Sequence, residues 1–177
     1  MTERYILTGA PGAGKTVLIR QLEREGFAVV EEAATDVIAL DQAKGVAEPW
    51  RDPAFIQTIA ALQIQRLETA PAAVLQFHDR SLICTYALAQ FLGHEVAPLE
   101  TAIAKAIDAG LFMRRVFFIE LLGFITPTAA RRIDLAEAQR FERTHDDAYR
   151  GFGFELFRIP PGSIDDRVAA IRRAVGA

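Results

Sequence analysis

The sequence contains one cysteine and three histidines, and none of them forms the spacing of a metal site. Cys84 has no partner in the chain for a disulfide, so the sequence predicts neither a disulfide framework nor a zinc site. We expect Cys84 to be a core residue, and His78, His94 and His145 to be ordinary structural residues. Free thiols are typical of a reducing compartment, which predicts a cytoplasmic location.

Long apolar runs are also missing. Only residues 1–8 precede the first glycine-rich segment, which is too little chain for a signal peptide. The most apolar stretch, residues 116–125, is short and is interrupted by Glu120. We therefore expect no membrane span.

Charge of one sign is not in excess either. The chain has 20 basic and 23 acidic residues, and its formal net charge is −3. The basic residues are dispersed, so no basic stripe indicates a nucleic-acid partner. A length of 177 residues with 51% hydrophobic residues suits one globular domain. We expect a single domain over residues 1–177, and the oligomeric state stays open.

Apolar segments typical of strands alternate with segments of helical periodicity along the chain. The predicted strands are residues 5–8, 27–30, 73–78, 115–122 and 154–159. The predicted helices are residues 15–25, 33–44, 54–69, 82–92, 99–109 and 135–150, and a last helix that follows an N-cap at Ser163. In the first helix we expect Val17, Leu18 and Leu22 on the apolar side. The alternation predicts an α/β fold of three layers, with a parallel five-stranded sheet flanked by helices.

Residues 9–16 read GAPGAGKT and match the P-loop pattern G-x-x-x-x-G-K-[ST] at every fixed position. They lie between a predicted strand and a predicted helix, where backbone N–H groups can surround phosphates. We expect Lys15 to reach the β- and γ-phosphates of ATP or GTP, and the Thr16 hydroxyl to bind Mg²⁺. The predicted nucleotide-binding residues are Gly9, Gly12, Ala13, Gly14, Lys15 and Thr16. The alternative is a glycine-rich turn that matches by chance.

Acidic residues follow two of the predicted strands. The carboxyl ends of parallel strands share one edge of a sheet, so Glu31, Glu32, Asp79 and Arg80 are expected near the P-loop. Asp79 has the Walker-B position of a metal ligand, and Arg80 beside it can bind phosphate or the acceptor hydroxyl. The alternative is a surface Asp-Arg pair.

A phosphoryl acceptor hydroxyl benefits from a base that takes its proton, and Glu32 or Glu31 can serve as that base. The alternative for both acids is a solvated position at the N-terminus of the following helix.

These segments resemble the nucleoside-kinase and thymidylate-kinase branch of P-loop proteins, in which an acid-Arg-Ser or Asp-Arg segment follows the third strand. The order of residues 29–34 (VVEEAA), 78–81 (HDRS) and 149–155 (YRGFGFE) is similar to AAA-type ATPase/kinase domains related to the ribosylnicotinamide kinase part of NadR-like proteins. The resemblance covers most of the chain and implies a P-loop kinase fold.

The resemblance also implies roles in acceptor binding and in a lid. Residues 55–58 (FIQT) are similar to a deoxynucleoside kinase segment whose glutamine contacts the acceptor base, which makes Gln57 a candidate substrate-binding residue beside Arg80. Trp50 is expected to line that pocket or to pack beneath it. Arg131 and Arg132 have the place of a basic lid, although an aspartate often found before the lid arginine is replaced by a TAA stretch. The alternatives are a solvent-facing glutamine and a charged stretch that opens a helix.

The motifs favour a Mg-ATP-dependent kinase that acts on a hydroxyl or phosphate group of a small nucleoside-like or nucleotide-like acceptor. The candidate catalytic residues are Lys15, Glu32, Asp79, Arg80, Arg131 and Arg132, and the candidate metal ligands are Thr16 and Asp79. One alternative is an ATP- or GTP-dependent hydrolase or switch without a small-molecule acceptor. Another is a binding module that has lost catalysis.

Overall fold

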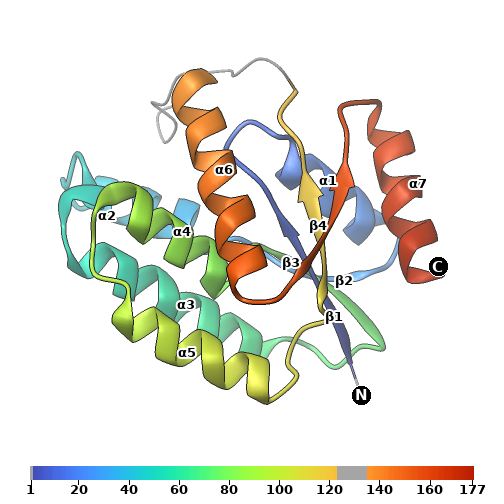
Figure 1. The fold of residues 1–177 in the computed structure, drawn as a ribbon, viewed down its shortest axis with the longest axis horizontal. Helices are drawn as coiled ribbons and strands as arrows, with labels where there is room; N and C mark the ends of the chain where they lie inside the picture. The colour runs from blue at the N-terminus through green and yellow to red at the C-terminus, as the bar shows by residue number, and fades with distance from the viewer. Residues whose placement is uncertain (1, 123–134) are drawn as a thin grey trace.

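A computed structural model describes residues 2–122 and 135–177 of the chain. Strands and helices alternate in them as predicted (Figure 1). The elements are β1 Glu3–Thr8, α1 Lys15–Arg24, β2 Ala28–Val30, α2 Ala34–Ala43, the 3₁₀ helix η1 Pro49–Arg51, α3 Ala54–Thr69, β3 Leu75–Asp79, α4 Leu82–Leu92, α5 Ala97–Asp108, β4 Arg115–Ile119, α6 Leu135–Gly151, β5 Glu155–Ile159 and α7 Ile164–Val175.

The strands form one parallel sheet in the order β2-β3-β1-β4-β5, which confirms the predicted fold class. β1 is central, and its residues Ile6 and Leu7 are fully buried because both faces of the sheet are covered. After β1 the chain first builds β2 and β3 on one side, then crosses to β4 and β5 on the other. The end of β1 is therefore the topological switch point of the sheet, where open α/β folds bind their ligands.

Helices cover the two faces of the sheet unequally (Figure 1). α1 and α7 pack on one face over a core that includes Leu22, Phe77, Phe117 and Ile171. The larger group of helices lies on the other face, and its core joins residues of α2, α3, α4, α5 and α6. None of the helices in the described ranges has the length and apolarity that crossing a membrane requires.

Two details of the helices differ from the predictions. α5 begins at Ala97 instead of residue 99, because Pro98 lies in the first turn, where its missing N–H leaves no hydrogen bond unmade. Val17 is not on the buried side of α1: its side chain is 46% exposed, whereas Leu18 and Leu22 are buried. Residues 17, 18 and 22 cannot all face one core, because residue 17 is 100° from residue 18 around a helix of 3.6 residues per turn.

Candidate functional site

The P-loop connects the end of β1 to the start of α1, and its shape depends on glycine. At Gly9 the backbone φ is +130°, and a Cβ atom there would lie 2.3 Å from the carbonyl oxygen of Ile119 at the end of β4. Gly14, with φ +84°, is the N-cap of α1. Only glycine adopts these angles without strain, so the loop can pass this close to the neighbouring strand.

Lys15, the first residue of α1, is buried beneath this loop. Its Nζ donates a 2.8 Å hydrogen bond to the carbonyl oxygen of Ala10. Burial, and then the positive charge of Arg80, lower the pKa of Lys15 to about 7, although Asp79 and Glu32 act in the opposite direction. A buried ammonium group with a lowered pKa is stabilised by any anion that comes within reach, and the loop places it for that purpose.

Glu32 and Arg80, which follow β2 and β3, meet across the edge of the sheet. Arg80 Nε lies 2.6 Å from Glu32 Oε1. Thr35 Oγ1 donates a 2.8 Å hydrogen bond to the other oxygen of Glu32, and Arg66 from α3 donates to the Glu31 and Glu32 carbonyls. Burial would raise the pKa of Glu32, but Arg80, Lys15 and the Thr35 hydroxyl together lower it. Glu32 is thus an ionised carboxylate aimed at the P-loop, whereas Glu31 is exposed.

The backbone of Arg80 is strained. Its φ of +74° is the only positive value at a non-glycine residue among the described residues, and such a conformation costs about 1 kcal/mol or more. The structure holds it in place: Arg80 N donates to Leu7 O at 3.0 Å, and Nη1 lies 3.3 Å from Gly9 O. Burial would lower the pKa of Arg80, but Glu32, Cys84 and Asp79 raise it. Arg80 is a permanent cation between the base candidate and the P-loop.

Asp79 is buried at the end of β3, one residue before Arg80. Its Oδ1 atom has no hydrogen-bond partner among the described residues. Burial, and then the nearby Glu32 carboxylate, raise the pKa of Asp79 to about 6, against the opposing effect of Lys15 and Arg80. A buried carboxylate oxygen without a partner fits a cation, and hard oxygen ligands such as this one and the Thr16 hydroxyl suit Mg²⁺.

A cavity of about 650 Å³ opens beside the P-loop, Glu32 and Arg80, whereas Asp79 is not part of its wall. One end, which we call the phosphate end, is lined by the P-loop and the first turn of α1, including Gly12, Lys15 and Thr16, and by the exposed Val17. Glu32 and Arg80 lie on the wall beyond it. The volume is within the range of small-molecule sites.

The other end of the cavity, which we call the acceptor end, is lined mainly by apolar side chains. They come from α2, η1, α3, α4 and α6: Ile38, Trp50, Phe55, Leu88, Phe91, Leu92 and Phe141. Trp50 therefore lines the pocket, which is one of the two positions expected for it. Glu48 and Glu137 are also part of the wall, and the Glu48 carboxylate is paired with Arg51 at 2.6 Å.

Gln57, the expected acceptor contact, is exposed and is not part of the cavity wall. Gln63 lies on the wall instead, with Nε2 bonded to Ser81 O (3.2 Å) and Oε1 accepting from Thr85 (2.8 Å). The reason is the helical repeat: Phe55, Ile59 and Gln63 are spaced four residues apart on the inner face of α3, and Gln57 is off this stripe. The similarity of residues 55–58 to a kinase segment could not show this arrangement, because a short segment carries no information on which face of its helix points inward.

Two residues of α6 also reach this site, and sequence reasoning assigned them no function. His145 Nε2 lies 3.4 Å from Arg80 Nη1, and Tyr149 OH lies 2.7 Å from Ser81 Oγ. The buried Cys84, a core residue as expected, lies 3.2 Å from the same tyrosine oxygen. The available signal was the four-residue spacing of Phe141, His145 and Tyr149, which predicts one face of a helix.

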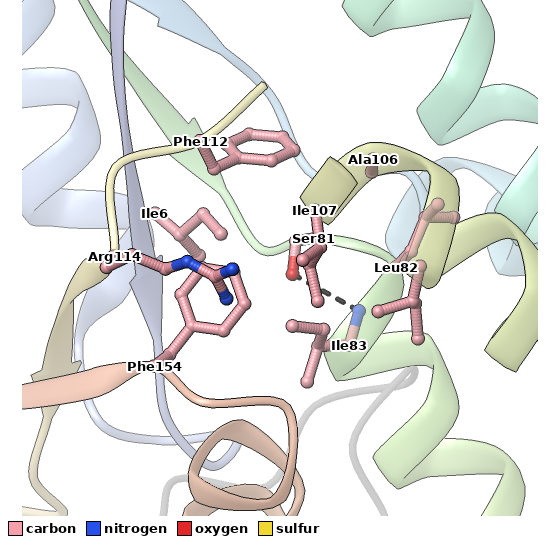
Figure 2. Close-up of a pocket in the computed structure, with 10 residues that line it drawn as sticks. Ile6, Ser81, Leu82, Ile83, Ala106, Ile107, Phe112, Arg114 and Phe154 are labelled. Carbon is pink, nitrogen blue, oxygen red and sulfur yellow. Dashed lines mark hydrogen bonds between the residues drawn. The ribbon is translucent and has the colours of Figure 1, made fainter. Parts of the chain in front are cut away.

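A second, much smaller cavity has Ser81 among its lining residues (Figure 2). Ser81 is the N-cap of α4, and its Oγ accepts a hydrogen bond from Ile83 N. The space there is about 20 Å³, with Ile6, Phe112 and Phe154 among its lining residues. That volume holds about one water molecule, so the large cavity is the candidate site.

The remaining predicted residues fall into two groups. His78 and His94 bond to Gln76 Oε1 and to the Trp50 carbonyl, in keeping with structural roles. Arg131 and Arg132, the candidate lid arginines, lie outside the described residues, so their role stays a prediction.

Comparison with known proteins gives both a family and structural relatives. A family model described as AAA domain matches residues 4–167. Among solved structures, a deoxyadenosine kinase from M. mycoides with the products dCMP and dCDP is similar, with a TM-score of 0.69 and 11% identity over 98% of each chain. No curated protein sequence is a significant match.

Two structures of NadR are similar as well. The complex with NR has a TM-score of 0.72 and 17% identity, and the complex with NAD and AMP-PNP has 0.71 and 16%. Each alignment covers 99% of this chain but only 51% and 50% of the NadR chains, so this chain spans about half of their length. Identities this low show a shared fold, and this fold is that of P-loop proteins, including nucleoside kinases.

Proposed function

The chain belongs to the AAA domain family, and we propose that it is a Mg-ATP-dependent kinase that phosphorylates a hydroxyl group of a small acceptor. The observation that carries the proposal is the cavity itself. It joins the P-loop to an apolar chamber, and the Glu32–Arg80 pair lies on its wall. A hydrolase needs room only for water beside the γ-phosphate, whereas a kinase needs a second chamber of this kind.

Each residue has a chemical role in this proposal. Lys15 and the P-loop amides hold the phosphates of ATP. Glu32 accepts the proton of the acceptor hydroxyl, whose oxygen bonds to the γ-phosphorus while the bond to the β–γ bridging oxygen breaks and ADP leaves. Arg80, held beside Glu32, stabilises the charge that develops on the transferred group. Thr16 and Asp79 would hold Mg²⁺, which neutralises phosphate charge when bound.

The charges of the acceptor end favour a hydroxyl over a phosphate as the acceptor group. Among the described residues that line the cavity, the cationic side chains are Lys15 and Arg80, both beside the P-loop. In the described part of the wall, the chamber beyond them offers no cation that would pair with the phosphate of a phosphorylated acceptor. Aromatic and aliphatic walls suit a ring system, as the base of a nucleoside would provide. The deoxyadenosine kinase that shares this fold was crystallised with dCMP and dCDP, ligands that carry such a base.

The test is turnover of ATP and GTP with a panel of nucleosides and related alcohols, each paired with its own monophosphate, and with an acceptor-free control. We expect ADP release that depends on an unphosphorylated acceptor, with formation of its phosphate ester. Equal ADP release without any acceptor would replace the kinase by a hydrolase or switch. Turnover restricted to the monophosphates would overturn the choice of acceptor group.

A further inference from the structure

α6 presents a polar edge to the turn that carries Arg80. His145 and Tyr149 are one helical turn apart, and they contact Arg80 and Ser81, which are consecutive in the chain. Both side chains are completely buried although α6 as a whole has a polar outer face. Burial of two polar side chains requires partners, and these two have theirs at the candidate catalytic turn.

The two ring nitrogens of His145 have different neighbours, which determine where the proton is. Nδ1 lies 2.9 Å from the carbonyl oxygen of Phe141, and a carbonyl oxygen can only accept a hydrogen bond. Nδ1 therefore carries the proton. Nε2 faces the guanidinium of Arg80, which can only donate, so the neutral ring with an unprotonated Nε2 satisfies both neighbours.

We propose that His145 is a positioning residue for Arg80: its unprotonated Nε2 accepts from Nη1 and keeps the guanidinium between Glu32 and the P-loop. The same Nη1 also approaches Gly9 O, and Nε lies within ion-pair distance of Glu32, so three neighbours surround the guanidinium. A guanidinium on a long, flexible side chain keeps one orientation only where its own contacts hold it. Burial, and then the charge of Arg80, lower the pKa of His145 to about 3, which keeps the ring neutral at physiological pH.

The other histidines provide an internal control. His78 is also buried, but its Nε2 lies 2.8 Å from Gln76 Oε1, an acceptor. His94 Nε2 lies 2.9 Å from the Trp50 carbonyl oxygen. Both rings therefore carry a proton on Nε2, whereas His145 carries its proton on Nδ1.

The first experiment uses the wild-type protein without substrate, so it does not depend on a variant that folds. Two-bond ¹⁵N–¹H correlation spectra of the histidine rings distinguish the two neutral forms. We expect His145 in the Nδ1–H form from about pH 8 to about pH 5, and His78 in the Nε2–H form. An Nε2–H ring at His145, or protonation of His145 near its ordinary pKa, would overturn the proposal whatever the protein catalyses.

The second experiment measures kinetics and rests on the proposed function. Gln places its Oε1 where His145 has Nε2, whereas Asn places its amide where the ring has Nδ1. We expect H145Q to keep most of the wild-type kcat, and H145N to lose about tenfold to a hundredfold, with the Mg-ATP affinity of both unchanged. H78Q removes an equally buried histidine and is expected to leave kcat unchanged.

The outcomes separate the two proposals. Equal kcat for H145Q and H145N, or an equal loss in both that parallels a lower melting temperature, would make His145 a packing residue and overturn the positioning role. Absence of acceptor-dependent turnover in the wild-type protein would instead defeat the kinase proposal, and the ring spectra would still decide the contact between His145 and Arg80.

Discussion

The two ends of the large cavity are built in opposite ways. The phosphate end consists of one uninterrupted stretch, residues 9–16 and the first turn of α1. The acceptor end is built from separate side chains on α2, η1, α3, α4 and α6, which are spread over residues 38 to 141. A contiguous loop can be recognised from its own residues, whereas a chamber built by packing can be recognised only after the helices have been placed.

The chemistry of the two ends differs in the same way. In the proposed kinase, backbone groups and one buried lysine bind the phosphates at the phosphate end, so its chemistry does not depend on which acceptor is used. At the acceptor end, side-chain size and charge determine what fits, so a related chain can change its substrate by changing these residues without touching the P-loop. Predictions can therefore be directed at one end, at the other, or at the Glu32–Arg80 pair between them.

The largest effect is expected at Glu32, where the two ends meet. Glu32→Gln keeps the size of the side chain but removes the base, so kcat should fall by about 10² to 10⁴-fold while Mg-ATP still binds. Calorimetry for ATP and a coupled assay for ADP measure the two quantities separately. Glu31→Gln is the matched control, because Glu31 is the adjacent, exposed acid. A loss at Glu31 with Glu32 unaffected would contradict the assignment of the base.

The next effect is expected at the phosphate end. Lys15→Met preserves the length of the buried side chain but removes its charge, and it should weaken Mg-ATP binding by about 10² to 10³-fold for every acceptor. Circular dichroism verifies that the variant is folded. Lys44→Met, at a lysine that is 62% exposed, is the control. Unchanged Mg-ATP affinity in a folded Lys15→Met protein would remove the P-loop from nucleotide binding.

The contrast between the two ends of the cavity also explains which features of the molecule could be predicted from the sequence. Strand and helix order, the parallel sheet, the P-loop and the convergence of Glu32 with Arg80 all follow from patterns along the chain or from strand-end geometry. Gln57 was left with two possible positions, and the contacts of His145 and Gln63 were not predicted, because all three depend on how α3 and α6 are rotated against α4. A side chain on an amphipathic helix acquires such a role only from its tertiary partners.

A smaller effect is expected at the acceptor end. Leu88 on α4 is partly buried and faces the chamber, so Leu88→Trp should fill part of it. We expect the KM of the acceptor to rise by about tenfold or more and the affinity for Mg-ATP to stay unchanged. Ile64→Trp, on the outer side of α3, is the control because Ile64 is 37% exposed and is not part of the cavity wall. A change in Mg-ATP affinity with no change in acceptor KM would mean that the two ends are assigned the wrong way round.

The smallest effect is a pH dependence of the phosphate end, and its sign follows from Lys15. In the free protein the pKa of Lys15 is lowered to about 7, so at about pH 8 most molecules carry a neutral amine. Bound phosphates favour the ammonium form and raise this pKa, so the protein must take up a proton when it binds ATP. Proton uptake on binding means that affinity falls as pH rises, by up to about tenfold per pH unit above pH 7.

Calorimetry of Mg-ATP binding in buffers of different ionisation enthalpy measures this uptake, and we expect close to one proton per site at about pH 8. Asp79 limits binding at lower pH. Its pKa is raised to about 6, so Mg²⁺-dependent binding should weaken below that pH as its carboxylate is protonated. Lys15→Met should abolish the uptake at pH 8, and Asp79→Asn should abolish the acid limb and leave the uptake in place. Binding without proton uptake in the wild-type protein would show that Lys15 is already charged before the nucleotide arrives, and that the phosphate end does not depend on a neutral lysine.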